Sequence, residues 1–238
     1  MLLSACGADE TNRIYISAAS SLQEVMVDLV AEFNVAHPEI DVHVNFGGSS
    51  GLQVQIREGF PVDVFLSAHP GPIETLNREG LVTMHAPFAT SQVVLITTNP
   101  EMTDIYDLAS ENITLTLANR EVPIGFYAHE ILENIDLNQP GFLAAVEENV
   151  TTYAMNVRQA MSHVTLGESD ATFVYTTDIR GAVDFYVIEI PEVYAGVPIF
   201  YVALINRDTV TSNGEDFYRF MLSNVAQEVL VRHGFNEN

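Results

Sequence analysis

The alternation of strand-like and helix-like segments along the first 80 residues constrains the fold most strongly. Short runs at 13–19, 41–46 and 62–67 have the length, the apolar content or the alternating pattern of β-strands. Each is followed by a segment with helical spacing, and the first of these carries one apolar stripe from Leu22 to Phe33. A β-α-β-α-β-α order predicts a mostly parallel sheet covered by helices.

Further elements continue this pattern to the end of the chain. The sequence predicts strands at 92–98, 113–118, 171–176, 187–190 and 199–205, and helices at 127–135, 142–149, 156–165 and 214–233. No stretch approaches the roughly 20 apolar residues that a membrane-spanning helix needs. A length of 238 residues suits two modest lobes or one large α/β domain.

The charge balance excludes one class of function. The chain has 9 Lys and Arg against 32 Asp and Glu, a net charge of −23. Nucleic-acid binding requires a basic face, so we expect no nucleic-acid partner. The acidity is typical of a solubility adaptation, and it makes anion binding a puzzle that needs a physical answer.

Two predicted strands are followed by small hydroxyl residues at the start of a helix. These are Ser20 and Ser21 in the first turn, and Gly48, Ser49 and Ser50 in the second. A helix N-terminus presents unsatisfied N–H groups and a partial positive charge, and a Ser adds a hydroxyl donor. Two such turns facing one crevice would form an anion site without a cation. Taken singly, a Ser at this position is more often only a helix cap.

The capping alternative has a specific form in the first turn. Ser20 and Ser21 stand three residues before Gln23 and Glu24, so either pair could form a capping box. In that arrangement the serine hydroxyl would be occupied by the helix backbone.

Several ordered motifs give the chain a resemblance to a known family. It resembles the periplasmic molybdate-binding proteins of bacterial ABC importers, the ModA family, over nearly its whole length. The matching stretches are AASSL at 18–22, NFGGSSGL at 45–52, PVDVFLSA at 61–68, VPIGFYA at 122–128, NVRQA at 156–160, FVYTTD at 173–178 and HGF at 233–235.

The resemblance implies an α/β, two-lobed, type II periplasmic-binding-protein fold. Mixed sheets would be flanked by helices, with the ligand cleft between the lobes. The implied division gives residues 13–91 plus 200–238 to a discontinuous first lobe and 92–199 to the second, after a lipobox and tether at 1–12.

The resemblance also implies a set of ligand-binding residues, each uncharged. These are Ser21 and Ser49 through hydroxyl and backbone donors, Ile124 and Val157 through backbone N–H groups, and Tyr175 through its phenol, supported by Ser20, Gly48 and Ser50. Ile124 stands where the family usually has Ala, a departure that could change the pocket volume or the closure of the lobes.

A set of neutral donors answers the charge puzzle. Hydrogen bonds to a charged acceptor contribute about 1.5–3 kcal/mol each, which can offset the desolvation of a dianion. We therefore expect a monomeric protein that captures molybdate or tungstate without a cofactor, performs no catalysis, and delivers the anion to a permease and its ATPase.

Cys6 carries the prediction of cellular location. The run Leu3-Ser4-Ala5-Cys6-Gly7 resembles a bacterial lipobox, in which the cysteine becomes lipidated. We expect the protein to act outside the cytoplasmic membrane and to touch it only through this lipid anchor.

Three alternatives remain open from the sequence. The most serious is the same fold binding another oxyanion, such as sulfate, phosphate or a phosphonate. The second is a serine hydrolase that uses Ser21 or Ser49 as its nucleophile, but the chain has no G-x-S-x-G elbow. The third is a metal-binding lipoprotein, but the chain has no His or Cys residues at the spacing of metal ligands.

Overall fold

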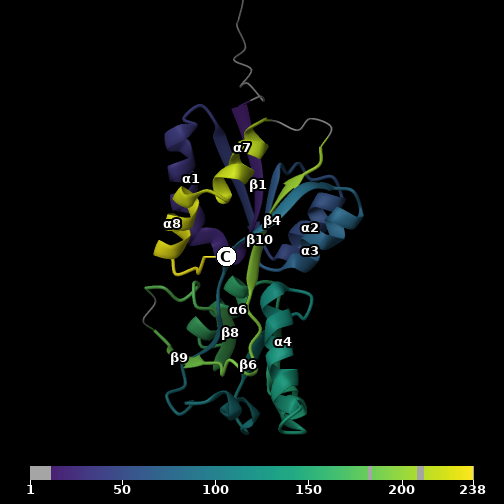
Figure 1. Ribbon diagram of the computed structural model, residues 1–238. Helices are drawn as coiled ribbons and strands as arrows, with labels where there is room; N and C mark the ends of the chain where they lie inside the picture. Colours follow the sequence, from purple (N-terminus) through teal and green to yellow (C-terminus); the bar gives the residue numbers. More distant parts are fainter. Residues whose placement is uncertain (1–11, 182–183, 208–211, 238) are drawn as a thin grey trace, which may run out of the picture.

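The computed structural model describes residues 12–181, 184–207 and 212–237. Two lobes lie one above the other, each built on one five-stranded sheet flanked by helices (Figure 1). The predicted fold class, two mixed sheets in a two-lobed arrangement, is confirmed.

The first sheet has the strand order β2-β1-β3-β10-β4. Strand β1 lies between β2 and β3 and pairs in parallel with both, and β10 is antiparallel to both β3 and β4. Its strands are β1 (Arg13–Ala19), β2 (Asp41–Gly47), β3 (Val64–Ser67), β4 (Val82–Thr90) and β10 (Ile199–Ile205).

The second sheet has the order β7-β6-β8-β5-β9. Strand β6 pairs in parallel with β7 and β8, and β5 is antiparallel to β8 and β9. Its strands are β5 (Val93–Thr97), β6 (Leu115–Ala118), β7 (Val150–Ala154), β8 (Ala171–Tyr175) and β9 (Tyr186–Glu189).

Helices cover both sheets and bury their apolar stripes against them. In α1, Leu29 and Phe33 are fully buried, and the ring of Phe33 meets that of Phe217 edge-on at 5.0 Å. The first lobe carries η2 (Ser20–Leu22), α1 (Gln23–Ala36), α2 (Ser49–Arg57), α3 (Pro70–Arg78), α7 (Ser212–Met221) and α8 (Asn224–Arg232). The second carries η3 (Ile105–Ala109), α4 (Pro123–Asp136), α5 (Phe142–Glu148) and α6 (Val157–Thr165).

The single long helix predicted for 214–233 is wrong, because α7 and α8 are separate helices. The break falls at Leu222 and Ser223, and the Ser223 hydroxyl accepts a hydrogen bond from the Ala226 N–H at 3.3 Å as the N-cap of α8. The apolar stripe continues on both sides of this break, so periodicity alone does not reveal it.

Two strands, β4 and β7, were not expected from the sequence. Both lie at the edge of a sheet. Edge strands are half exposed, so their apolar signal is weak, and β7 shows alternating partial burial and exposure along most of its length. Strand β4 contains Pro87 next to a register shift in its pairing with β10, a position at which an edge strand tolerates proline.

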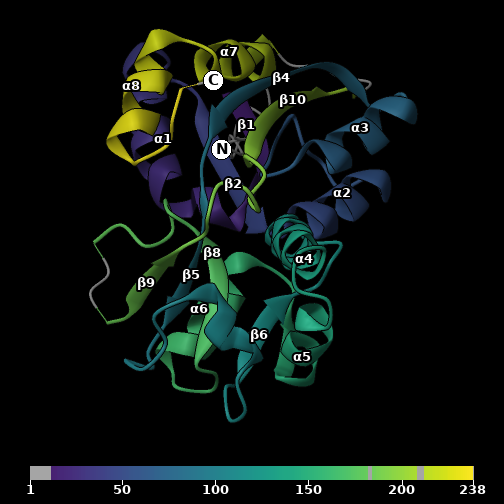
Figure 2. The same ribbon diagram turned by 60° about the horizontal axis from the view of Figure 1, so that its bottom comes forward.

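The chain passes between the sheets where β4 leads to β5 and where β9 leads to β10 (Figure 2). The two connections lie side by side, since the Ser91 N–H donates to the Pro198 carbonyl at 3.1 Å. The Thr176 N–H also donates to the Gln92 carbonyl at 2.9 Å. These bonds link the two connections and the end of β8.

Candidate functional site

A small cavity lies between the lobes, at the carboxyl ends of the parallel strands. Its walls enclose about 200 Å³ of space, including the mouth. Strands β1, β2 and β3 end on one side of it, and β6, β7 and β8 end on the other. The carboxyl ends of parallel strands form the usual ligand crevice of α/β sheets, because the following helix N-termini converge there.

The wall from the first lobe is made of small and hydroxyl-bearing residues. It consists of Ala19, Ser20 and Ser21 at the end of β1, Gly47, Gly48 and Ser49 at the end of β2, and Ala68 after β3.

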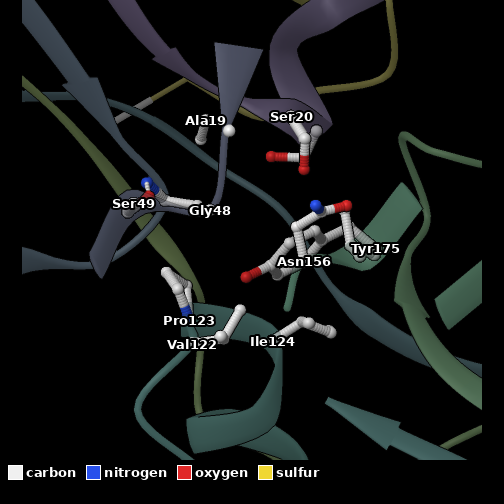
Figure 3. A pocket seen from close by; sticks show the side chains of 13 residues that line it. Ala19, Ser20, Gly48, Ser49, Val122, Pro123, Ile124, Asn156 and Tyr175 are labelled. Atoms are coloured by element: carbon white, nitrogen blue, oxygen red, sulfur yellow. Dashed lines mark hydrogen bonds between the residues drawn. The ribbon is translucent and has the colours of Figure 1, made fainter. Parts of the chain in front are cut away.

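The wall from the second lobe is made of helix starts and one tyrosine. It consists of Val122, Pro123 and Ile124 after β6, Asn156 and Val157 after β7, and Tyr175 at the end of β8. Figure 3 shows the labelled residues of the two lobes facing one another across the cavity. The thirteen lining residues are all uncharged.

Two of the hydroxyl groups in this cavity are buried and lack hydrogen-bond partners among the described residues. They are the Oγ of Ser21 and the phenol of Tyr175. The Oγ of Ser49 accepts a hydrogen bond from the Ala68 N–H at 3.2 Å, which leaves its own hydrogen free to donate. Buried polar groups are normally paired, so a cluster of unpaired hydroxyls indicates a site built for a ligand.

The capping box considered for Ser20 and Ser21 does not form. Both residues lie in the 3-10 turn η2, whose N-terminus has no side-chain cap, and α1 begins after them at Gln23 without one. Because no backbone N–H uses the Ser21 hydroxyl, that hydroxyl remains available to a ligand.

Three helices, α2, α4 and α6, begin at the cavity, and their first-turn N–H groups add to the donor set. The start of α4 packs very closely on the end of β6. A Cβ at Gly125 would lie 2.0 Å from the carbonyl oxygen of Asn119, so only glycine fits there. Gly48 has a similar role between the lobes, since a Cβ there would lie 2.5 Å from the carbonyl oxygen of Met155.

Burial keeps the Tyr175 phenol protonated. Desolvation raises its pKa well above the usual value of 10.0, and the neighbouring Tyr127 and Asp178 raise it further. Behind it, burial raises the pKa of Asp178 to about 7, opposed by the Arg158 charge and by the Tyr175 N–H, which donates to this carboxylate at 3.0 Å. At neutral pH Tyr175 is therefore a neutral hydrogen-bond donor.

Seven of the eight residues predicted for the site or its support line the cavity: Ser20, Ser21, Gly48, Ser49, Ile124, Val157 and Tyr175. Ser50 does not line it. Its hydroxyl donates instead to the carbonyl oxygen of Glu121, a contact between the lobes. Ile124 is buried against the cavity, where its side chain narrows the space.

Sequence reasoning missed six lining residues: Ala19, Gly47, Ala68, Val122, Pro123 and Asn156. Four of them lie at or within two residues of the end of a parallel strand, whereas Val122 and Pro123 follow β6 at the start of α4. Position after a parallel strand is the one signal that could have found them. Most are small or apolar side chains that shape the wall and carry no recognisable ligand chemistry. Asn156 is also the N-cap of α6, accepting from the Gln159 N–H at 2.9 Å.

A family model described as bacterial extracellular solute-binding protein matches residues 14–236. The chain belongs to this family. The match spans both lobes and every residue that lines the cavity, and it places the chain among extracytoplasmic solute-binding proteins.

Two relatives of this solute-binding protein align over nearly its full length. YvgL of Bacillus subtilis, named as a candidate substrate-binding lipoprotein of an ABC transporter, is 27% identical, covering 99% of this chain and 93% of its own. The molybdate-binding protein ModA of Mycobacterium tuberculosis is 24% identical, covering 93% of this chain and 84% of its own.

Solved structures share the fold. The periplasmic molybdate-binding protein of Azotobacter vinelandii superposes with a TM-score of 0.81 at 22% identity, covering 94% of this chain and 99% of its own. The sulfate-binding protein SubI of Mycobacterium tuberculosis gives 0.82 at 18% identity, covering 95% and 87%. The two-lobed frame is therefore common to binders of different anions.

Other features of the solute-binding protein bear on the alternative functions. Within 12–181, 184–207 and 212–237, no three His, Cys, Asp or Glu residues are grouped as a metal site would require. In the same ranges, every helix is too short or too polar to cross a bilayer. Cys6 and its predicted lipobox lie outside the described residues.

Proposed function

We propose that this protein captures a tetrahedral oxyanion, molybdate or tungstate, outside the cytoplasmic membrane and delivers it to an ABC importer. One observation carries the proposal: uncharged donors from both lobes converge on one small cavity, where the hydroxyls of Ser21 and Tyr175 are buried and unpartnered. The alignment with a molybdate-binding relative supports the choice of anion.

Neutral donors suit a dianion in a protein of net charge −23. Hydroxyl and N–H groups bonded to a charged acceptor contribute about 1.5–3 kcal/mol each and offset its desolvation. The field of the surface carboxylates is largely screened beyond about 8–10 Å at ordinary salt, so it slows capture more than it weakens the closed complex.

The same donor set favours a fully deprotonated anion. Such an anion accepts hydrogen bonds at every oxygen, whereas a protonated phosphate would turn an O–H toward one of the donors. Sulfate is the alternative that this argument leaves in place. The frame itself does not discriminate, because the molybdate-binding and sulfate-binding structures superpose equally well.

Catalysis is a remote alternative, and we propose that the protein has none and needs no cofactor. A serine nucleophile needs a base within hydrogen-bond reach. The lining residues include Ser21 and Ser49 but no His, Asp, Glu or Lys. The family, one of transport solute-binding proteins, supports the same conclusion.

The implied partners follow from the family. A solute-binding protein of an ABC importer works with a membrane permease, and we propose that a dedicated ATPase completes the system. We propose further that the protein is a monomer held at the outer face of the membrane by a lipid on Cys6.

A panel of anions tests the proposed function. Melting temperature is measured with molybdate, tungstate, sulfate, phosphate and chromate, and affinities by isothermal titration. We expect molybdate and tungstate to give the largest shifts. No shift with any of the five would contradict oxyanion binding, and a dominant sulfate shift would favour the alternative.

Two substitutions test the site itself. Ser49→Ala and Tyr175→Phe should each weaken binding by about 1–3 kcal/mol, because each removes a donor to a buried charged acceptor. Tyr153→Phe is the control, since Tyr153 is half exposed on β7 and lies outside the cavity. Unchanged affinity in both site variants would mean that the anion binds elsewhere in the protein.

A further inference from the structure

An ion pair joins the two lobes beside the cavity. Arg158, on α6 of the second lobe, places Nη1 2.8 Å from the Oε1 of Glu24, on α1 of the first lobe. In Figure 1, α1 lies in the upper lobe and α6 in the lower one. The pair therefore depends on the approach of the two lobes.

Both partners are close neighbours of the cavity wall in the sequence. Glu24 stands three residues after Ser21, and Arg158 directly follows Val157. A change in the distance between the lobes at this wall must therefore change the distance between the two charges.

Arg158 has little else to bond with. Its Nε and Nη2 are buried and have no hydrogen-bond partner among the described residues. Its other charged neighbour is Asp178, whose Oδ1 lies 3.7 Å from Nε. Of the hydrogen bonds and ion pairs that Arg158 makes in the described part of the chain, the bond to Glu24 is the one that crosses between the lobes.

Asp178 connects this pair to the ligand site within the second lobe. Its side chain is fully buried, and its Oδ2 accepts a hydrogen bond from the Tyr175 N–H at 3.0 Å. The arginine that reaches across to Glu24 thus packs against the carboxylate that fixes the backbone of a cavity-lining tyrosine. Separation of the lobes would break the bond to Glu24 and leave the contacts within the second lobe in place.

We propose that the Glu24–Arg158 pair is a latch that holds the lobes together over the bound oxyanion and limits its release. The latch rests on the proposed function, and Glu24 is a positioning residue that does not touch the ligand. Because the pair forms only when the lobes meet, it slows dissociation and leaves the encounter rate nearly unchanged.

The test compares Glu24→Gln with Glu215→Gln. Glu215 is a close match: it lies in the first turn of α7 and pairs with Arg219, but that arginine belongs to the same helix. Both substitutions remove one negative charge and one first-turn carboxylate. They differ in whether the broken pair crosses between the lobes.

Dissociation of molybdate is measured by stopped-flow tyrosine fluorescence, since the chain has nine Tyr and no Trp. We expect Glu24→Gln to raise the dissociation rate roughly 3- to 10-fold, above the effect of a fully exposed pair because the Arg158 side chain is partly buried. The association rate should stay within about twofold. Glu215→Gln should change neither rate.

Two results would overturn the latch. One is equal dissociation rates for Glu24→Gln and Glu215→Gln. The other is a slower association that accounts for all of the lost affinity. Failure of the proposed function is read separately, because it would appear as no oxyanion binding by the unaltered protein.

Discussion

The sheet order β2-β1-β3-β10-β4 of the first lobe corresponds strand for strand to β7-β6-β8-β5-β9 of the second. Each sheet has three parallel strands, then two strands in an antiparallel arrangement, and each sends the ends of its three parallel strands to the cavity. The lobes differ in the residues that follow those strands. The first lobe supplies serines and small residues with the start of α2, and the second supplies the starts of α4 and α6 and one phenol.

This difference indicates that the same backbone fold can present different hydrogen-bond donors to the cavity, depending on the residues that follow each strand. Equivalent turns in equivalent sheets present a Ser21 hydroxyl in one lobe and the start of α4 at Ile124 in the other. The frame brings six strand ends together, and the turn residues decide which donors are offered. Four predictions test this comparison, from the largest expected effect to the smallest.

The largest effect concerns two glycines, each at the third position of a helix that begins at the cavity: Gly125 in α4 of the second lobe and Gly51 in α2 of the first. Gly125→Ala should lower the free energy of unfolding by roughly 3 kcal/mol or more, because its Cβ would lie 2.0 Å from the Asn119 carbonyl oxygen. Gly51→Ala meets open space and should be neutral or stabilise by up to about 1 kcal/mol. Urea denaturation measures both, and similar losses would contradict the packing difference.

The second prediction uses the buried aspartate of the second lobe. Its folded pKa, about 7, lies above its unfolded value of 3.8 because of burial. Between about pH 4 and 7 the native state therefore holds a proton that the unfolded state has released, so stability from Asp178 is lost as the pH rises through 7. Relative to Asp178→Asn, the unaltered protein should lose on the order of a few kcal/mol across that window. Urea denaturation at several pH values checks this.

Asp63 of the first lobe supplies the contrast. It is buried too, but it pairs with Arg207 at 2.8 Å and accepts from the Tyr15 N–H at 2.7 Å. Asp63→Asn should destabilise the protein at pH 7 by about 1–3 kcal/mol, because Arg207 loses its charged partner. An equal loss of stability at pH 7 from Asp63→Asn and from Asp178→Asn would contradict the assigned environments.

The third prediction concerns the unpartnered hydroxyls, one from each lobe. Ser21→Ala should leave the unfolding free energy of the ligand-free protein unchanged or raise it by up to about 1 kcal/mol, because it removes a buried donor without a partner. The same holds for Tyr175→Phe. Oxyanion affinity should fall by about 1–3 kcal/mol in both. Calorimetric unfolding and isothermal titration measure the two effects, and a large loss of ligand-free stability would mean that these hydroxyls are structural.

The smallest effect compares two N-caps. Asn156 caps α6 at the cavity, and Ser223 caps α8 away from it. Removing either cap by substitution to Ala should cost about 1 kcal/mol of stability. We expect Asn156→Ala also to weaken oxyanion binding, whereas Ser223→Ala should leave it unchanged. An equal effect on binding would remove the distinction between a cap at the site and a cap elsewhere.

The sequence anticipated the central elements better than the edges. Strands β1 and β10 were placed with their observed bounds, because buried strands carry strong apolar runs. Strands β4 and β7 were missed, since an edge strand is partly exposed and its pattern is diluted. The break between α7 and α8 was missed because the apolar stripe indicates only which face of a helix is buried. The same stripe continues through the local turn at Ser223, so it does not show where one helix ends and the next begins.

The amino-acid sequence by itself determined the α/β pattern, the serine turns after β1 and β2, and the acidic charge balance from which we expect no nucleic-acid partner. Tertiary structure decided which of those serines face a ligand. It turned Ser50 toward Glu121, left Ser21 without a partner, and set Glu24 against Arg158 from the opposite lobe. The physical reason is that helix caps and periodicity are local, whereas a cavity between lobes is assembled from strand ends more than 100 residues apart along the chain.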